Sequence, residues 1–424
     1  MRYLILGLLC LMAGIAYIQR AAISVPAELI ATDLKIENFE RSMGWVQSAW
    51  YLGYALLQIP AGRMADLYGS RRTLALLCSI WSTLALLTGF STGWYSLMLF
   101  WFLMGAAQAG AFPCAAAAIS QTFPDSQRAR ASGILAAGMA VGGAVAPMLA
   151  GRTLNLLQPT AATWQLYSWQ ILLFLFAVPG FLWTGLFLIT VPNSALPVTA
   201  QKAKTSRLSH MLPLILKSTP LALLCTQQFL RAAGMVFFLT WFPVFLQKTR
   251  GIEIKQSADL TSLAGIGGVL GSLTGGIASD WLLKTTGNRR LSRQGIAVVG
   301  MSLCSLLIVC SAFVHNLYLS ITLVAAGAFC ATFGGVSGYT VAIEFGGSQV
   351  ATVFSLMNMC GNFGAMLFPI TSGWMVERFR NWELMLFFFA AIMAIDAICW
   401  AFLNPQRPLF SDSDSDIGKR HDVA

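Results

Sequence analysis

Charged residues are scarce in this sequence. Only 10% of the 424 residues are Asp, Glu, Lys or Arg, whereas an average soluble domain has about 25%. Hydrophobic residues make up 57% of the chain. This balance excludes an ordinary soluble domain and indicates a protein that crosses a membrane many times.

Metal ligands and redox motifs are also lacking. The chain has three histidines, which fall in predicted loops or the tail and form no ligand cluster. The nine cysteines lie in apolar runs without a CxxC pair, so we interpret them as small core residues. Without a P-loop or a nucleophile constellation, the sequence predicts no cofactor, no metal site and no enzyme activity.

Apolar runs long enough to span a bilayer are the dominant feature. About 20 residues are needed for one crossing. A signal peptide at residues 1–22 is disfavoured, because its removal would break an even set of spans. We therefore predict an all-α membrane protein with twelve transmembrane helices, at 3–24, 43–63, 72–91, 94–118, 131–153, 168–191, 221–247, 258–283, 294–314, 316–343, 349–373 and 383–403.

Basic residues are unevenly distributed over the connections. With a cytoplasmic N-terminus, the inner segments hold 17 of the 27 Lys and Arg residues and the outer segments hold 8. By the positive-inside rule, this asymmetry predicts a multi-pass inner-membrane protein with both termini in the cytoplasm. These loops explain the net charge of +10, so no nucleic acid is expected. The lipid bilayer is the expected partner, and we expect a monomer.

The longest connection divides the twelve spans into six and six. We predict a six-helix bundle at 1–191, a polar and basic cytoplasmic linker at 192–220, a second six-helix bundle at 221–404 and a disordered tail at 405–424.

The two predicted bundles carry related sequence. FPDSQRA begins at Phe123 and FGGSQVA at Phe345, and each phenylalanine is followed 24 residues later by a proline. GRMAD in the first half has an echo, GIASD, in the second. Such matches suggest duplication, and parallel six-helix halves bind substrate between them near the membrane midplane.

The stretch GRMADLYGSRR resembles the loop motif of the major facilitator superfamily, G-x-x-x-D-(R/K)-x-G-R-(R/K), although Leu67 and Ser70 stand where basic residues are usual. Glycine lets helices approach closely, and the aspartate can cap a helix or pair with arginine. The resemblance implies an inner gate. Its predicted residues are Gly62, Asp66, Gly69, Arg71 and Arg72, with Asp280 and Glu344 in the second half.

A closer resemblance covers nearly the whole chain. YIQR, SAWYLGYALLQIPAG, GAFP, TFPDSQRARASG, FFLTWFP and NMCGNFGAMLFP, in this order, are similar to the anion:cation symporter family. Its members carry organic anions such as sugar acids, aromatic carboxylates and sialic acid, and some carry phosphate. The resemblance implies a symporter or antiporter of a small organic anion, which can use a coupling ion.

Two arginines lie inside predicted spans. Arg20 is in the outer half of the first span, where snorkelling to the surface competes with the role that the resemblance implies, which is to face the central cavity and bind an oxyanion. Arg231 is near the middle of the seventh span, where a structural arginine bonded to helix-end carbonyls is the alternative. Besides these arginines, we expect substrate contacts from Tyr17, which lies three residues before Arg20 on the same helical face, and from Gln19. The resemblance implies that Tyr54, Gln108, Tyr339 and Asn358 share this binding pocket.

The usual proton relay of this family is missing from the first half. Proton-coupled relatives commonly have aspartate before the first-span arginine, and arginine and glutamate in the fourth span. These positions are Gln19, Trp101 and Gln108 here, and arginine alone does not titrate usefully. We therefore predict that this relay does not operate. In the second half, we expect Asp396 in the last span to hydrogen-bond a neighbouring helix.

These features predict a secondary active transporter that moves a small organic anion by alternating access. The alternative is a transporter-like membrane sensor that binds an organic anion without moving it. Such a sensor usually needs a signalling partner or an added domain, and the short linker and tail are too small to fold as one.

Overall fold

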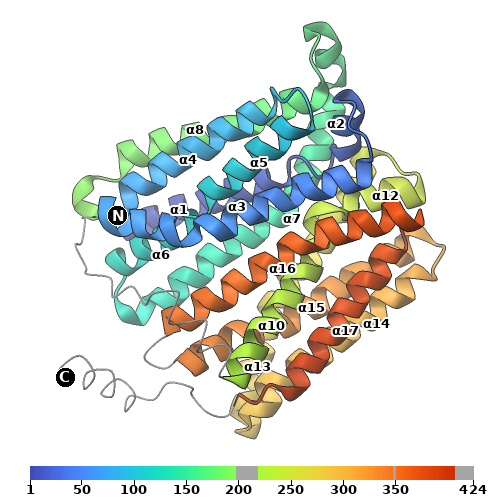
Figure 1. The fold of residues 1–424 in the computed structure, drawn as a ribbon. Helices are drawn as coiled ribbons and strands as arrows, with labels where there is room; N and C mark the ends of the chain where they lie inside the picture. The colour runs from blue at the N-terminus through green and yellow to red at the C-terminus, as the bar shows by residue number, and fades with distance from the viewer. Residues whose placement is uncertain (197–217, 347–349, 406–424) are drawn as a thin grey trace, which may run out of the picture. The chain divides into compact units, whose positions relative to one another are not determined.

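The computed structural model of the protein describes residues 1–196, 218–346 and 350–405 (Figure 1). All regular secondary structure in these ranges is helical. Most of the predicted linker and nearly all of the predicted tail lie outside the described residues, so those two predictions stay predictions.

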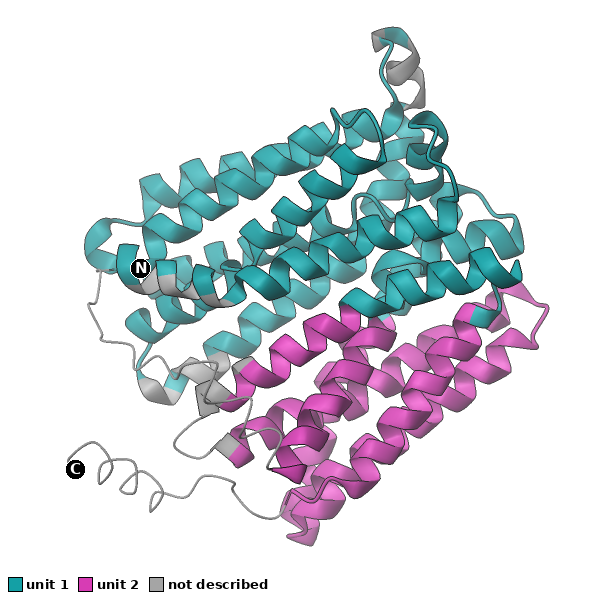
Figure 2. Ribbon diagram, viewed as in Figure 1, with its two compact units in different colours: residues 1–203, 236–266, 366–384 teal, residues 204–235, 267–365, 385–424 magenta. Residues whose placement is uncertain are grey.

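The chain forms two compact units (Figure 2). Unit 1 consists of residues 1–203, 236–266 and 366–384, and unit 2 of residues 204–235, 267–365 and 385–424. Two long helices contribute residues to both units, namely α13 (Ile254–Thr286) and α16 (Val350–Phe379).

The first predicted half forms eight helices of unit 1. They are α1 (Arg2–Ala21), α2 (Ala27–Asp33), α3 (Phe39–Tyr68), α4 (Ser70–Thr88), α5 (Trp94–Gln108), α6 (Ala111–Thr122), α7 (Asp125–Trp164) and α8 (Ser168–Thr190), followed by a single turn, η1 (Asn193–Ala195). The short α2 has no counterpart among the predicted spans, and α7 continues well beyond its predicted end.

The second predicted half begins with a broken helix and continues with long ones. Its remaining elements are α10 (Thr219–Met235), α11 (Phe237–Thr240), α12 (Phe242–Arg250), the π-helical turn η2 (Arg290–Gly295), α14 (Ile296–Ala312), α15 (Leu317–Gly346) and α17 (Leu384–Phe402).

Every predicted span coincides with helix in the structure. By length and composition, nine helical stretches among the described residues can cross a membrane. The other three predicted spans coincide with α3, α4 and α16, which are helices of 30, 19 and 30 residues. The protein is therefore a multi-pass helical membrane protein.

Proline explains where two predicted spans are interrupted. A proline ring clashes with the carbonyl four residues earlier and removes one helical hydrogen bond. Pro113 stands four residues after Ala109, where α5 gives way to α6, and Pro243 stands four residues after Leu239, where α11 gives way to α12. The predicted spans at 94–118 and 221–247 are therefore helical but interrupted at these points.

Close packing of α3 against α5 positions the candidate site. A Cβ atom built on Gly105 would lie 2.0 Å from the backbone oxygen of Trp50, and one on Gly53 would lie 2.1 Å from that of Phe102. Only glycine permits such an approach. The backbone of α3 is thereby fixed at Trp50, which contacts the first arginine.

Within unit 1, the segments 236–266 and 366–384 pack against α1 to α8. Arg152 of α7 forms an ion pair with Asp259 of α13, with Nε and Oδ1 3.2 Å apart. Nearby, the Met148 amide donates to the hydroxyl of Ser262 over 2.9 Å. These contacts tie the second half of α7 to the first part of α13.

Candidate binding site and gate

Arg20 is enclosed by aromatic rings in unit 1. Its guanidinium carbon lies 3.9 Å from the ring centroid of Trp50, 4.5 Å from that of Tyr51 and 5.4 Å from that of Tyr17. None of the ion pairs found within the described residues includes Arg20. The positive charge is therefore stabilised by cation–π contacts, which leave it without a bound counter-charge.

A small cavity adjoins this guanidinium. It measures about 10 Å³ and is lined by Arg20, Gln47, Trp50 and Trp101 among others, which is room for about one water molecule. The Nε of Arg20, the Nε1 of Trp50 and both polar atoms of the Gln47 side chain are buried without a hydrogen-bond partner in the described part of the chain. Three types of N–H donor are therefore left available beside the cavity.

Gln47 and Trp50 were missed by the sequence reasoning, which chose Tyr54 from the same helix. Tyr54 stacks on Trp50, with ring centroids 5.0 Å apart. The missing signal was spacing, because residues 47, 50, 51 and 54 recur at intervals of three and four and therefore share one face of α3. Tyr17, by contrast, was predicted and does contact Arg20.

The three positions of the absent relay lie on α1 (Gln19) and α5 (Trp101 and Gln108). Trp101 lines the cavity with Arg20 and is 2% exposed. The Gln108 side-chain amide donates to the backbone oxygen of Ala16 over 3.4 Å. Gln19 is turned toward α4 and α8, since its Nε2 donates to the Phe176 backbone oxygen over 2.9 Å and to the Ser82 hydroxyl over 3.4 Å.

Arg231 occupies a polar setting in unit 2. Its Nη2 donates to the Gln228 side chain over 2.8 Å and to the Tyr339 hydroxyl over 3.1 Å. Its guanidinium carbon also lies 5.2 Å from the Tyr339 ring centroid. A Cβ atom on Gly335 would lie 2.9 Å from Arg231 Cδ, so glycine leaves room for the arginine stem. These hydrogen bonds go to side chains, so they do not support the alternative in which Arg231 is bonded to helix-end carbonyls.

The remaining predicted binding residues belong to unit 2 as well. Tyr339 stacks on Phe354, with ring centroids 5.7 Å apart, and is 39% exposed. Asn358 is half-buried, and its backbone oxygen accepts a hydrogen bond from Asn362. The structure thus brings Tyr339 to Arg231 and records no side-chain partner for Asn358 within its described residues.

The predicted gate of the first half is described in part. Gly62 and Asp66 lie in α3, but their side chains are outside the described residues, and Arg72 is exposed. Gly69 has φ +82° between α3 and α4, a backbone conformation that favours glycine. Arg71 donates to the Leu188 backbone oxygen over 2.7 Å and to the Asn193 side chain over 2.9 Å, and so caps the end of α8.

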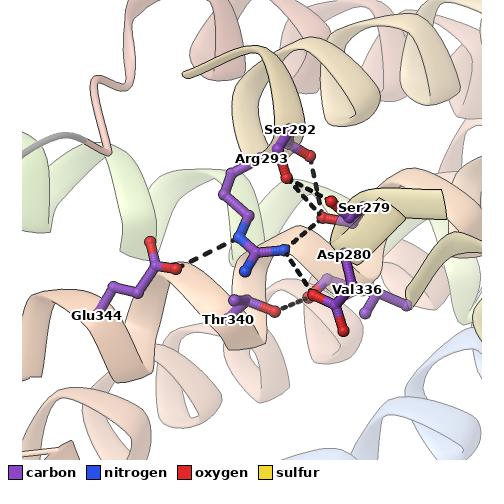
Figure 3. Close-up of polar contacts among 7 residues, drawn as sticks. All are labelled: Ser279, Asp280, Ser292, Arg293, Val336, Thr340 and Glu344. Carbon is purple, nitrogen blue, oxygen red and sulfur yellow. Dashed lines mark hydrogen bonds and ion pairs between the residues drawn. The ribbon is translucent and has the colours of Figure 1, made fainter. Parts of the chain in front are cut away.

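The predicted gate of the second half is a charged cluster centred on an arginine that the sequence reasoning did not select (Figure 3). Arg293, on the π-helical turn η2, is 6% exposed. It pairs with Asp280 of α13 over 3.2 Å and with Glu344 of α15 over 3.3 Å, and its Nη1 also donates to the Ser279 hydroxyl. One buried guanidinium therefore joins three elements.

A larger cavity of unit 1, about 370 Å³, is lined by residues that include Asn155, Glu253 and Lys255, and by none of the predicted binding residues. Among the described residues, no group of three or more His, Cys, Asp or Glu side chains is arranged to hold a metal.

Comparisons with known proteins agree on one family. The sequence profile of the Major Facilitator Superfamily matches residues 9–308 and 288–419. The chain is 30% identical to a probable sulfoacetate transporter of Cupriavidus necator, covering 99% of this chain and 98% of the relative. It is 25% identical to a probable galactarate/D-glucarate transporter of Escherichia coli K12, covering 95% and 94%.

Further comparisons concern a third relative and the fold. The chain is 26% identical to a hexuronate transporter of Bacillus subtilis, covering 87% and 86%. A bacterial homologue of the lysosomal transporter Spinster, in an inward-facing and occupied conformation, shares the fold with a TM-score of 0.78 at 18% identity, covering 95% of this chain and 96% of that one.

Proposed function

The chain belongs to the major facilitator superfamily, and from this premise we propose that it is a secondary active transporter that moves a small organic anion by alternating access. We place it in the inner membrane with both termini in the cytoplasm, as the distribution of basic residues predicts. The similar proteins are named for sulfoacetate, galactarate, D-glucarate and hexuronate transport. All of these are small organic anions.

The observation that carries this proposal is the setting of Arg20. A guanidinium at membrane depth, held by aromatic rings and beside unpartnered Nε, indole and amide donors, is prepared for a planar carboxylate or a sulfonate. Placing a charged guanidinium inside a membrane costs at least about 2.5 kcal/mol. Binding of an anion offsets that cost and also satisfies the buried donors.

We further propose that the family's usual relay does not operate in this chain. At the three relay positions this chain has Gln19, Trp101 and Gln108, none of which carries a titratable carboxylate. Uptake of an anion against an inside-negative potential costs about 2.3 kcal/mol per charge per 100 mV. The protein must therefore exchange one anion for another, export its anion, or couple uptake to a cation that binds outside these three positions.

Purified protein in proteoliposomes tests the proposal. We expect labelled sulfoacetate, D-glucarate or a hexuronate to enter vesicles that contain the wild-type protein and to enter empty vesicles far more slowly. Prior thermal-shift screening with the same anions identifies the best probe. Binding without uptake under every imposed ion gradient would favour the sensor, and absence of both binding and uptake would reject organic-anion transport.

A further inference from the structure

Asp396 in α17 is a buried carboxyl without a hydrogen-bond partner. It is 0% exposed, and neither of its carboxyl oxygens is hydrogen-bonded within the described residues. The expectation that it bonds a neighbouring helix is therefore wrong. An ionised carboxylate in such a place is unfavourable unless a charge or a proton compensates it.

The compensating charge comes from α10. These two helices run in opposite directions within unit 2 (Figure 1). They touch where a Cβ atom on Gly234 would lie 2.2 Å from Met393 Cε. Arg231 precedes Gly234 by three residues and Asp396 follows Met393 by three, so both lie nearly one turn from this contact in the same direction. Burial disfavours the ionised form of the Asp396 carboxyl, and the positive charge of Arg231 partly offsets that penalty.

Other titratable groups around Asp396 are thiols. Cys304 of α14 and Cys399 of α17 interact with the carboxyl electrostatically, and Cys330 of α15 interacts with Cys304. The turn η2 of unit 2 carries Arg293, whose donors are engaged by Ser279, Asp280 and Glu344. Arg231 is therefore the cation on which Asp396 depends in the described part of unit 2.

We propose that Asp396 is a proton-binding site coupled to anion binding at Arg231. In this proposal, which rests on the proposed transport of organic anions, the empty protein balances the Asp396 carboxylate against the Arg231 guanidinium. An arriving anion takes the guanidinium as its own counter-charge. The carboxylate then takes up one proton from solvent to become a neutral carboxylic acid.

The coupling is reciprocal. If a bound anion favours the protonated acid, then the protonated acid favours anion binding by the same factor. On release of the anion, Arg231 again compensates a carboxylate, and the proton leaves. Anion and proton would thus be transported together, with the anion bound at Arg231 and the proton bound at Asp396. This pair would replace the relay that the first half lacks.

Calorimetry of sulfoacetate binding tests the coupling directly. Titrations in two buffers of different ionisation enthalpy give the number of protons taken up per bound anion. We expect uptake of up to one proton in the wild type, with affinity falling by up to about tenfold per pH unit. Asp396→Asn should bind with no proton uptake, and Asp396→Glu should restore it. Glu383→Gln, which neutralises an exposed carboxyl just before α17, serves as the matched control and should behave as wild type.

Unchanged proton uptake in folded Asp396→Asn would overturn the proposal, as would a wild type that binds sulfoacetate with no proton uptake between about pH 5 and about pH 9. If neither sulfoacetate nor D-glucarate binds the wild type, the proposed function fails. A measurement without ligand then tests whether Asp396 binds a proton and depends on Arg231.

That measurement is infrared difference spectroscopy of the full-length protein over the same pH range. The carboxylic acid band that disappears in Asp396→Asn should titrate in the wild type. In Arg231→Gln the band should persist to higher pH, because the compensating charge is gone. A band that does not titrate, or that is unaffected by Arg231→Gln, would overturn the proposal whether or not an anion has been identified.

Discussion

At the scale of residues, Arg20 and Arg231 differ in what holds them. Arg20 rests on the rings of Tyr17, Trp50 and Tyr51, whereas Arg231 donates to Gln228 and Tyr339. Aromatic faces stabilise a cation but accept none of its conventional hydrogen bonds. Arg20 therefore keeps its Nε donor for a ligand, while Nη2 of Arg231 is already engaged by side-chain acceptors.

Arg20→Lys should weaken anion binding at least about tenfold. The lysine keeps the charge but loses the planar fork, and one charge-assisted hydrogen bond is worth about 1.5–3 kcal/mol. Thermal-shift titration with sulfoacetate measures the loss, with the exposed Arg378→Lys as the matched control. Wild-type affinity in folded Arg20→Lys would show that this guanidinium does not bind the substrate.

Gln47→Met should stabilise the empty protein and weaken binding of the anion. Gln47 is 2% exposed, and its polar atoms have no partner among the described residues, which costs about 1–3 kcal/mol. Methionine has a similar shape without that cost. Melting temperatures with and without sulfoacetate measure both effects. A lower melting temperature for the unliganded variant would indicate that Gln47 supports the fold instead.

At the scale of elements, Arg293 joins three of them. The π-helical turn η2 places its guanidinium between Asp280 of α13 and Glu344 of α15. The two partners differ in exposure, because the Asp280 side chain is 69% exposed and that of Glu344 is 21% exposed. A screened surface pair contributes little, so Glu344 is expected to be the stronger partner.

Glu344→Gln should therefore destabilise the protein by about 1–3 kcal/mol, whereas Asp280→Asn should change its stability by less than about 1 kcal/mol. Because the cluster serves a gate in our interpretation, Glu344→Gln should also slow transport and leave sulfoacetate affinity within about threefold. Melting curves, binding titrations and proteoliposome uptake separate these effects. Equal behaviour of the two variants would contradict this ranking.

At the scale of the whole molecule, alternating access requires that packed helix ends separate and close again. Within unit 1, the second half of α7 and the first part of α13 are joined by the pair of Arg152 with Asp259 and by the bond from Met148 to Ser262. The ion pair between Arg152 and Asp259 is partly exposed. Such pairs are weak enough to break in the proposed transport cycle.

Joining α7 and α13 covalently at Arg152 and Asp259 should stop transport. We expect Arg152→Cys combined with Asp259→Cys, treated with a short reducible thiol cross-linker, to lose sulfoacetate uptake and to regain it after reduction. The two single variants, treated alike, control for the native cysteines, all of which are free among the described residues. Undiminished uptake in fully cross-linked protein would show that α7 and α13 need not separate here.

Much of the element pattern could be predicted from sequence. All predicted spans coincide with helices, because about 20 consecutive apolar residues in a membrane must satisfy their backbone groups within a helix. The breaks near Ala109 and Trp241 were not predicted, although Pro113 and Pro243 encode them. The reason is that proline is tolerated inside some long helices, as Pro60 is in α3.

The sequence by itself determined the family, the helical class and the presence of two arginines in the spans, because these follow from composition, periodicity and local motifs. Only the tertiary structure decided what surrounds each charge. Gln47 and Trp50 come to Arg20 through the packing of α3 on α5, and Asp396 comes to Arg231 through the packing of α17 on α10. Contacts between distant segments depend on the helix faces that meet, and a single sequence does not state which faces those are.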